Sequence, residues 1–307
     1  MSPSLTASAS SLAELTHRIE QVEVLPTDWI RLGGDRYLIS ARWLHPFFVP
    51  VHGYSFDPLL VVESMRQSSI LVSHVGFGVP TDHRFVMNSM SFAAEQGALS
   101  GAERGCTETG GDAVIEVHCT DVLHRGRQLA GLRTEVQVRF GGRLVATGAG
   151  NIGFVRPSVY ERLRGHCPLS TDAAVRTAPL PTPLDPWLVG RASEEDVLLA
   201  PSGQQDCWQL RCDPTHPVLF HRPSDHVPGM MLLEAARQAA HAATVSSRPF
   251  VPLGGGLKFH RYAELDQPVW IQAYAVDLGR DGCSVVVRGR QNDTLVFEGV
   301  LAAGADA

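Results

Sequence analysis

Lysine is nearly absent from this chain: Lys258 is its single lysine, and the other 25 of the 26 basic residues are arginine. Two interpretations are open. One is the codon bias of a GC-rich genome, and the other is selection for guanidinium groups that grip phosphate or carboxylate in a bidentate way. An excess of positive charge is also lacking, because 32 acidic residues give a formal net charge of −6. That balance argues against a general nucleic-acid-binding protein.

Patterns that define several other classes of protein are absent as well. The N-terminus lacks the basic residues and apolar segment of a signal peptide, and charged residues interrupt the most apolar stretch, 59–79, so that it cannot span a bilayer. The six cysteines form no Cys-x-x-Cys pair, and no His/Cys/Asp spacing suits zinc. The chain also lacks the Gly-x-Ser-x-Gly elbow that would indicate a serine hydrolase. We therefore expect a cytoplasmic protein with reduced thiols, no membrane association, no metal and no cofactor.

The chain does contain an internal repeat. Residues 57–67 and 228–238 each place four apolar residues before a Glu-x-x-Arg-Gln motif. Each polar residue of the first motif lies 171 residues before its counterpart in the second; the pairs are Glu63 with Glu234, Arg66 with Arg237 and Gln67 with Gln238. A His/Pro/Phe-rich segment precedes both motifs, at 44–49 and at 216–221. Three polar identities at one offset indicate that the chain is built as two copies.

Segments with β-strand patterning follow each motif. In chain order they are 113–120, 129–140 and 144–155 in the first copy, and 269–278, 283–290 and 294–302 in the second. Gly141-Gly142, Asp281-Gly282 and Asn292-Asp293 have the composition of hairpin turns. Each copy therefore predicts an α+β domain with one central helix followed by antiparallel strands.

Proline marks the junction between the copies. Six prolines lie between positions 157 and 186, a density that disfavours helix interiors and central strands. We predict a disordered N-terminal tail at 1–20, a first domain at 21–156, a linker at 157–186 and a second domain at 187–307.

The repeated helix motif is the strongest candidate for chemistry. Glu63, Arg66 and Gln67 would share one helix face, and the helix is apolar nearly all round, so other structure should wrap it. A buried glutamate and arginine must be paired or face a cavity. An ion-pair network that fixes how the copies dock is one interpretation. The other is a reactive site, because a half-desolvated carboxylate has a raised pKa and suits a general base near neutral pH.

The start of the second helix differs from that of the first. Asp225-His226-Val227-Pro228-Gly229 opens it, and a helix start with exposed N–H groups can hold an anion or a developing oxyanion. The first copy has Asp57-Pro58 but no matching Asp-His, which indicates unequal roles. An ordinary surface or capping histidine is the alternative for His226, and we favour it for His221. The Gly254-Gly255-Gly256 triplet has no phosphate-loop context and should permit tight backbone passage between helix and strand.

A helix that opens with Pro-Gly, continues with four apolar residues and a glutamate, and is wrapped by antiparallel strands resembles the hotdog fold. Dehydratases and thioesterases that act on acyl-carrier-protein or coenzyme A thioesters use this fold. In those dehydratases a histidine stands fourteen residues before the glutamate, a position that Phe220 occupies here, with His221 beside it. That departure weighs against a dehydratase His/Glu pair.

The segments 25–29, 57–63, 76–80 and 225–240 are similar to the A-factor biosynthesis (AfsA-type) family of actinobacteria, as is the two-copy layout. The resemblance implies two tandem hotdog domains that form an intramolecular pseudo-dimer. It also implies an acyltransferase that joins a β-ketoacyl group, carried by an acyl carrier protein, to the hydroxyl of dihydroxyacetone phosphate. The phosphorylated ester is the precursor of γ-butyrolactone, butenolide or furan signalling molecules that control antibiotic production.

Such a transfer requires a base, donors for a tetrahedral oxyanion and cations for the phosphate. The resemblance points to Glu63, Glu234 and Arg237 as catalytic residues and leaves open which glutamate deprotonates the hydroxyl. Further candidates for binding substrate or phosphate are Arg66, Gln67, Gln238, His226 and Gly229.

Two other functions stay open on the sequence alone. One is a hotdog hydrolase or dehydratase of acyl thioesters, and the other is a non-enzymatic regulator that binds an acyl lactone. The ionic helix motif counts against the regulator, because an apolar pocket has no need of buried glutamates. The length and branching of the acyl chain, the ring type of the product, enzymatic ring closure, and a monomeric or homodimeric state also stay open.

Overall fold

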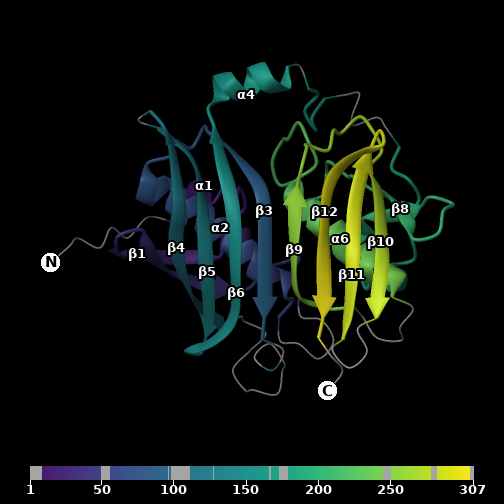
Figure 1. Ribbon diagram of the computed structural model, residues 1–307, viewed down its shortest axis with the longest axis horizontal. Coiled ribbons are helices and arrows are strands. Elements are labelled where there is room, and N and C mark those ends of the chain that lie inside the picture. The colour runs from purple at the N-terminus through teal and green to yellow at the C-terminus, as the bar shows by residue number, and fades with distance from the viewer. Residues whose placement is uncertain are drawn as a thin grey trace. The chain divides into compact units, whose positions relative to one another are not determined.

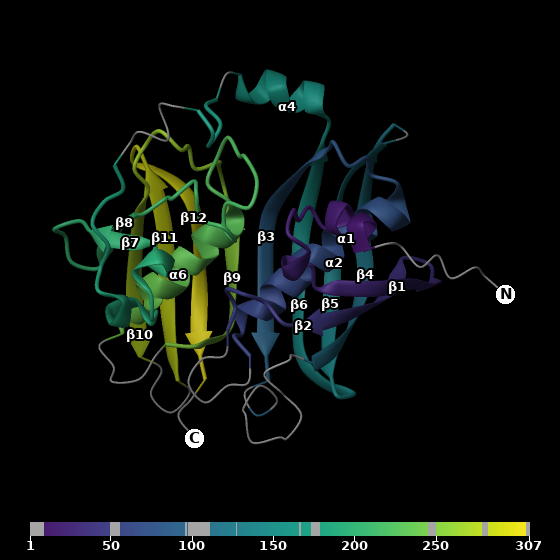
Figure 2. The same ribbon diagram turned by 180° about the vertical axis from the view of Figure 1, so that it is seen from behind.

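The computed structural model describes residues 9–304 apart from 50–55, 96, 98–110, 127, 166, 173–178, 245–249 and 278–281. The chain divides into two compact units, residues 1–164 and 165–307. Each unit contains one long helix lying against an antiparallel sheet, as Figures 1 and 2 show from opposite sides. The domain boundaries predicted at 156 and 187 lie on either side of this division and stay predictions.

The N-terminal unit consists of a central helix and a sheet. Its elements in chain order are α1 (Ala9–Leu15), η1 (Gln21–Glu23), β1 (Pro26–Gly33), β2 (Arg36–Trp43), α2 (Leu59–Phe77), β3 (Arg84–Ala94), β4 (Gly111–Arg125), β5 (Gln128–Phe140), β6 (Arg143–Val155) and α4 (Pro157–Arg164). The strand order in the sheet is β1-β2-β4-β5-β6-β3, and every neighbouring pair is antiparallel.

The C-terminal unit repeats this topology. Its elements are η2 (Pro186–Val189), η3 (Glu194–Asp196), β7 (Leu199–Pro201), β8 (Cys207–Leu210), α6 (Gly229–Ala243), β9 (Pro252–Phe259), β10 (Trp270–Asp277), β11 (Cys283–Gln291) and β12 (Thr294–Ala303). The strand order is β7-β8-β10-β11-β12-β9, again antiparallel throughout. The long helix follows the second strand in both units, so the predicted duplication and the α+β architecture are confirmed.

Both central helices are wrapped on nearly every side, as the apolar pattern predicts. In α2 every residue from Leu59 to His74 is buried except Arg66. In α6 every residue from Met231 to Ala240 is buried. The polar residues of the repeated motif therefore lie inside the two units, and Arg66 alone among them retains substantial contact with solvent.

The prediction of a disordered tail at 1–20 is wrong for the part that the structure describes. Residues 9–15 form α1, which packs against α2. Leu12 and Ala13 are buried, and burial of this small apolar face stabilises a helix that its Ser/Ala-rich composition did not predict. Residues 1–8 lie outside the described part of the chain.

The strands expected after each central helix are confirmed as β4–β6 and β10–β12, with position 278 outside the described residues. Gly141 and Gly142 form the β5–β6 turn with φ of 56° and 82°, and Asn292 and Asp293 form the β11–β12 turn with φ of 48° and 59°. These left-handed conformations suit the tight hairpin turns that the sequence predicts. Asp281 lies outside the described residues.

The prediction for the glycine triplet is wrong, because residues 254–256 lie within strand β9. Gly255 has a φ of 156°, and a Cβ there would clash with the carbonyl oxygen of Val300 on the neighbouring strand β12. Glycine thus permits close approach of two strands and not passage from helix to strand.

No helix in the described part of the chain combines the length and apolar character needed to cross a membrane. Cys119, Cys207 and Cys212 are free thiols, and among the described residues no cluster of His, Cys, Asp and Glu is arranged to hold a metal ion.

Candidate active site

The first repeated motif forms a buried ion-pair cluster in the N-terminal unit. Glu63 Oε1 accepts hydrogen bonds from Arg18 Nη2 at 2.5 Å, from Arg66 Nη2 at 2.9 Å and from Gln67 Nε2 at 2.6 Å. Arg66 Nε donates to Glu63 Oε2 at 2.9 Å. Arg18 also donates from Nη1 to the carboxylate of Glu23 at 2.7 Å. Glu63 is fully buried. The partners that a buried charge requires are the guanidinium groups of Arg18 and Arg66.

The second motif forms the matching cluster in the C-terminal unit. Glu234 Oε1 accepts hydrogen bonds from Arg191 Nε at 3.0 Å, from Arg237 Nη2 at 2.6 Å and from Gln238 Nε2 at 2.7 Å. Arg237 Nε donates to Glu234 Oε2 at 2.8 Å. Glu234 is also fully buried. The donor atoms of Arg237 and Gln238 and their acceptors correspond one to one with those of Arg66 and Gln67.

The same turn brings the second arginine to each cluster. Arg18 follows His17, which has a left-handed φ of 58°, and the Arg18 N–H bonds to the carbonyl of Ala13 in α1. Arg191 follows Gly190, with φ of 67°, and its N–H bonds to the carbonyl of Pro186 in η2. A left-handed residue with a hydrogen bond that spans five residues is a common helix ending. In both units it turns the chain so that the next arginine reaches the central helix.

The glutamines fasten a neighbouring segment to each helix. Gln67 donates to the backbone carbonyl of Glu23 and accepts from the N–H of Leu25. Gln238 does the same with Asp196 and Leu198. Because each amide also donates to its glutamate, Gln67 and Gln238 are positioning groups whose polar atoms are occupied.

The expectation of a raised pKa for the two glutamates is wrong. Burial alone would raise the pKa of Glu63, but the charges of Arg18 and Arg66 outweigh burial and hold that pKa well below its usual range. In the same way Arg191 and Arg237 overcome burial and lower the pKa of Glu234 to about 2. Both carboxylates are therefore ionised at neutral pH, and in the unliganded protein both are weak bases.

Arg66 is more exposed than the other three arginines of the two clusters. Its side chain is 19% exposed, whereas that of Arg237 is 5% exposed. Arg66 uses Nε and Nη2 to grip Glu63, and among the described residues no partner is recorded for Nη1. A guanidinium that a carboxylate fixes on one edge and that reaches solvent on the other is preorganised to bind an anion.

A buried histidine, which the sequence reasoning did not single out, accompanies each cluster. His45 Nδ1 accepts the backbone N–H groups of Phe47 and Phe48 at 3.2 and 3.4 Å. The charges of Glu63, Arg18 and Arg66 all act on the pKa of His45, which burial lowers to about 4. His216 accepts the corresponding bonds from the N–H groups of Val218 and Leu219, and the charge of Glu234 acts on the pKa of His216.

The helix-start candidates lie apart from the clusters. Gly229 is the first residue of α6, and at 1.5 Å per residue it lies roughly 7 Å along the axis from Glu234. His226 bonds to Asp225 at 2.7 Å and packs on the ring of Tyr262. No recorded bond between described residues joins His226 to Glu234 or Arg237. His221 bonds to the carbonyl of Val218, in keeping with the structural role favoured for it.

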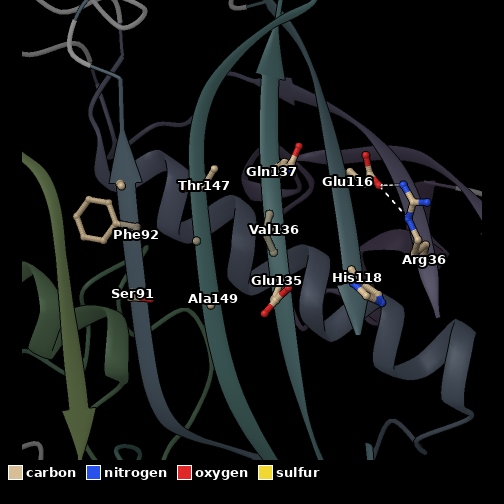
Figure 3. Close-up of a pocket in the computed structure, with 12 residues that line it drawn as sticks. Arg36, Ser91, Phe92, Glu116, His118, Glu135, Val136, Gln137, Thr147 and Ala149 are labelled. Atoms are coloured by element: carbon tan, nitrogen blue, oxygen red, sulfur yellow. Dashed lines mark hydrogen bonds and ion pairs between the residues drawn. The ribbon is translucent and has the colours of Figure 1, made fainter. Parts of the chain in front are cut away.

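A hollow of about 770 Å³ lies on the sheet of the N-terminal unit, across strands β2–β6 (Figure 3). Solvent-facing side chains line much of it, and the Arg36–Glu116 ion pair stands at one side. None of the predicted site residues lines this hollow. The clusters and the hollow are therefore separate features of the unit.

The fold and the paired clusters define a double hotdog protein, because each unit places a buried helix that carries a glutamate against an antiparallel sheet. Residues 8–156 and 173–303 match the A-factor biosynthesis hotdog domain, and the chain belongs to that family.

Curated relatives extend over almost the whole chain. A 2-oxo-3-(phosphooxy)propyl 3-oxoalkanoate synthase of Streptomyces coelicolor is 43% identical over 294 residues, which cover 95% of this chain and 90% of the relative. A synthase of the same name from Streptomyces virginiae is 43% identical over 289 residues, covering 92% and 94%. Among solved structures, an acyl-CoA thioesterase II from Mycobacterium marinum is 13% identical, with a TM-score of 0.50 over 96% of this chain and 98% of its own. That last likeness shows the fold.

The sequence reasoning identified Glu63, Arg66, Gln67 and their counterparts, and the structure brings each set of three together within its own unit. It missed six residues that bond to these sets or lie beside them. The missed residues are Arg18, Glu23, His45, Arg191, Asp196 and His216. A second offset carried a signal for some of them, because Glu23-Val24-Leu25 and Asp196-Val197-Leu198 lie 173 residues apart, as do Arg18 and Arg191.

Proposed function

We propose that this protein is an acyltransferase that condenses a 3-oxoacyl thioester with dihydroxyacetone phosphate to give a phosphorylated 3-oxoacyl ester. The observation that carries the proposal is the identity of 41–43%, over at least 92% of the chain, to curated relatives named 2-oxo-3-(phosphooxy)propyl 3-oxoalkanoate synthase. That name describes an ester. Its 2-oxo-3-(phosphooxy)propyl part has the skeleton of dihydroxyacetone phosphate, and its 3-oxoalkanoate part is a β-keto acid.

In this reaction the hydroxyl oxygen of dihydroxyacetone phosphate attacks the thioester carbonyl carbon. A C–O bond forms, the C–S bond breaks, and the thiol leaves with the proton that the hydroxyl gives up. Negative charge develops on the carbonyl oxygen in the tetrahedral intermediate, so a hydrogen-bond donor must meet it. The phosphate of the acceptor requires a fixed cation.

The cluster around Glu63 suits these needs. Arg66 would bind the phosphate through its solvent-facing edge, while Glu63 and Gln67 hold the guanidinium and the helix in place. A phosphate bound there adds negative charge beside Glu63, and like charges raise the pKa of a carboxylate. Glu63 is a weak base in the free protein and would become a stronger base only once the acceptor is bound. In that complex it could act as the general base that the sequence predicts.

Glu234, Arg237 and Gln238 form a second candidate site of the same type, and His226 with Gly229 forms a separate candidate for anion binding. We further propose that an acyl carrier protein presents the acyl group, that the reaction takes place in the cytoplasm, and that the ester is the precursor of a γ-butyrolactone, butenolide or furan signal.

The test is a reconstituted reaction analysed by mass spectrometry. The purified chain is incubated with a 3-oxoacyl group on an acyl carrier protein or on coenzyme A, together with dihydroxyacetone phosphate. Dihydroxyacetone without phosphate is the matched control acceptor. We expect the phosphorylated ester and free thiol, with the carrier protein as the better donor. Thiol release without any acceptor would instead support a hydrolase, loss of water from the donor a dehydratase, and binding without turnover a regulator.

A further inference from the structure

One polar atom beside the Glu63 cluster is buried without a partner. The side chain of His45 is buried, with 4% of the residue exposed, and Nε2 makes no hydrogen bond to any described residue. Burying a hydrogen-bonding group and leaving it unsatisfied is costly. An orphan of this kind in a native structure therefore calls for an explanation, and a ligand that completes the bond is one.

The backbone determines which hydrogen-bonding role Nε2 has. Nδ1 of His45 accepts two backbone N–H groups, from Phe47 and Phe48, so Nδ1 carries no proton. A neutral imidazole must then carry its proton on Nε2. The ring cannot accept a proton at Nδ1 without breaking the two backbone bonds. His45 is therefore fixed as a neutral N–H donor and has no route to act as a general base.

The matching histidine of the C-terminal unit has a different neighbour. His216 repeats the two backbone bonds to Nδ1, but its Nε2 lies 3.9 Å from the carboxylate of Asp196. The residue that corresponds to Asp196 is Glu23, whose carboxylate turns to Arg18. The N-terminal unit thus has a buried donor with no acceptor among the residues that the structure describes, and the C-terminal unit has a carboxylate facing the equivalent atom.

We infer that His45 Nε2–H donates a hydrogen bond to the thioester carbonyl oxygen of the acyl donor, and that acyl transfer takes place in the N-terminal unit. This inference rests on the proposed function. A neutral donor suits an oxygen that is uncharged in the substrate and gains charge in the tetrahedral intermediate. The phosphate of the acceptor is negatively charged and binds best to a full positive charge. Arg66, which is ion-paired with Glu63, supplies that charge.

The test separates the two roles of the histidine ring. In the His45→Asn variant, the asparagine oxygen can still accept the N–H groups of Phe47 and Phe48, but no donor reaches the position of Nε2. His216→Asn is the matched control. We expect His45→Asn to lower kcat about 100-fold, the effect typical of losing one oxyanion donor. KM for the thioester should change little, because the bond strengthens only as charge develops. His216→Asn should keep a kcat near that of the wild type.

A wild-type kcat in His45→Asn would overturn the inference, and so would equal losses in the two variants. If His45→Asn fails to fold, the wild-type protein labelled with ¹⁵N-histidine replaces it. A non-reactive amide analogue of the thioester, which keeps the carbonyl, should shift the Nε2–H resonance of His45, whereas an analogue without that carbonyl should not. Identical spectra with both analogues would overturn the inference.

The wild-type assay keeps the two proposals apart. Absence of ester from the wild-type protein would refute the proposed function. Ester from the wild-type protein together with an active His45→Asn variant would refute only the role of His45.

Discussion

The two units contain the same ion-pair cluster but leave different groups open. The donors of Arg66 and Gln67 around Glu63 match those of Arg237 and Gln238 around Glu234 atom for atom. Glu23 in one unit pairs with an arginine, whereas its counterpart Asp196 lies near a histidine. The two carboxylates differ by one methylene group. A duplicated scaffold can therefore keep its framework and still differ in which polar atom is free for a ligand.

The shared part of the clusters fastens helix to unit. Each glutamate ties together two arginines and a glutamine, and each glutamine holds the segment before the first strand of its unit. Retention of this arrangement in both copies indicates that the Glu–Arg–Gln framework holds the central helix in place in both units, in addition to the roles proposed for Glu63 and Arg66, while the differing neighbours distinguish the two units as sites for substrate.

The largest effect is expected from substitutions that break the shared framework. Glu63→Gln leaves Arg18 and Arg66 facing a neutral amide, and Glu234→Gln does the same to Arg191 and Arg237. Removing one partner of a buried ion pair typically costs about 3–5 kcal/mol, so each variant should destabilise its own unit by that order. Hydrogen exchange of peptides from α2 and α6 would measure the two losses separately. Unchanged protection of α2 in Glu63→Gln would show that the cluster does not stabilise the helix.

The helices and their apolar surroundings could be predicted from the sequence, because a buried helix and a strand each leave a periodic pattern over many residues. The repeated polar triad could also be predicted, because three identities share one offset. The pKa of the glutamates could not follow from that local pattern. Its direction depends on Arg18 and Arg191, which lie 45 and 43 residues from their glutamates in the chain and reach them only through tertiary packing.

The same reason explains why His45 and His216 escaped notice as site residues. Both stand in the His/Pro/Phe-rich segments that precede the two helices, and the sequence shows those segments to be repeated. What distinguishes the two histidines is the direction taken by Glu23 and Asp196. A difference of side-chain direction has no counterpart in residue spacing, so the asymmetry of the two units appears only in three dimensions.

The next largest effect tests which guanidinium binds the phosphate. Arg66→Gln should raise KM for dihydroxyacetone phosphate by about 10- to 100-fold, because a hydrogen bond to a charged group contributes on the order of 1.5–3 kcal/mol. Arg237→Gln is the control, since Arg237 is nearly enclosed. KM for the acyl thioester should stay constant in both. A rise in KM for the phosphate confined to Arg237→Gln would reverse the comparison and place the acceptor in the C-terminal unit.

The smallest expected effect is on stability in mild acid. Burial lowers the pKa of His45 from 6.5 to about 4, although the charge of Glu63 opposes this shift. The unfolded chain therefore takes up a proton at a higher pH than the folded chain. The stability that neutral His45 contributes is complete above about pH 6.5 and is lost as the pH falls towards 4. Between pH 7.5 and pH 5.5 this loss amounts to about 1 kcal/mol.

The two units should differ in this response. Burial lowers the pKa of His216 as well, but the nearby Asp196 favours its charged form, so less stability should be lost on acidification. Hydrogen exchange at pH 7.5 and pH 5.5, corrected for intrinsic rates, measures both units in one experiment. His45→Asn should remove about 1 kcal/mol of the acid loss in the N-terminal unit, and His216→Asn should remove less in the C-terminal unit. Equal changes in the two variants would mean that Asp196 does not act on His216, and the asymmetry between the two histidines would then lie only in their hydrogen bonding.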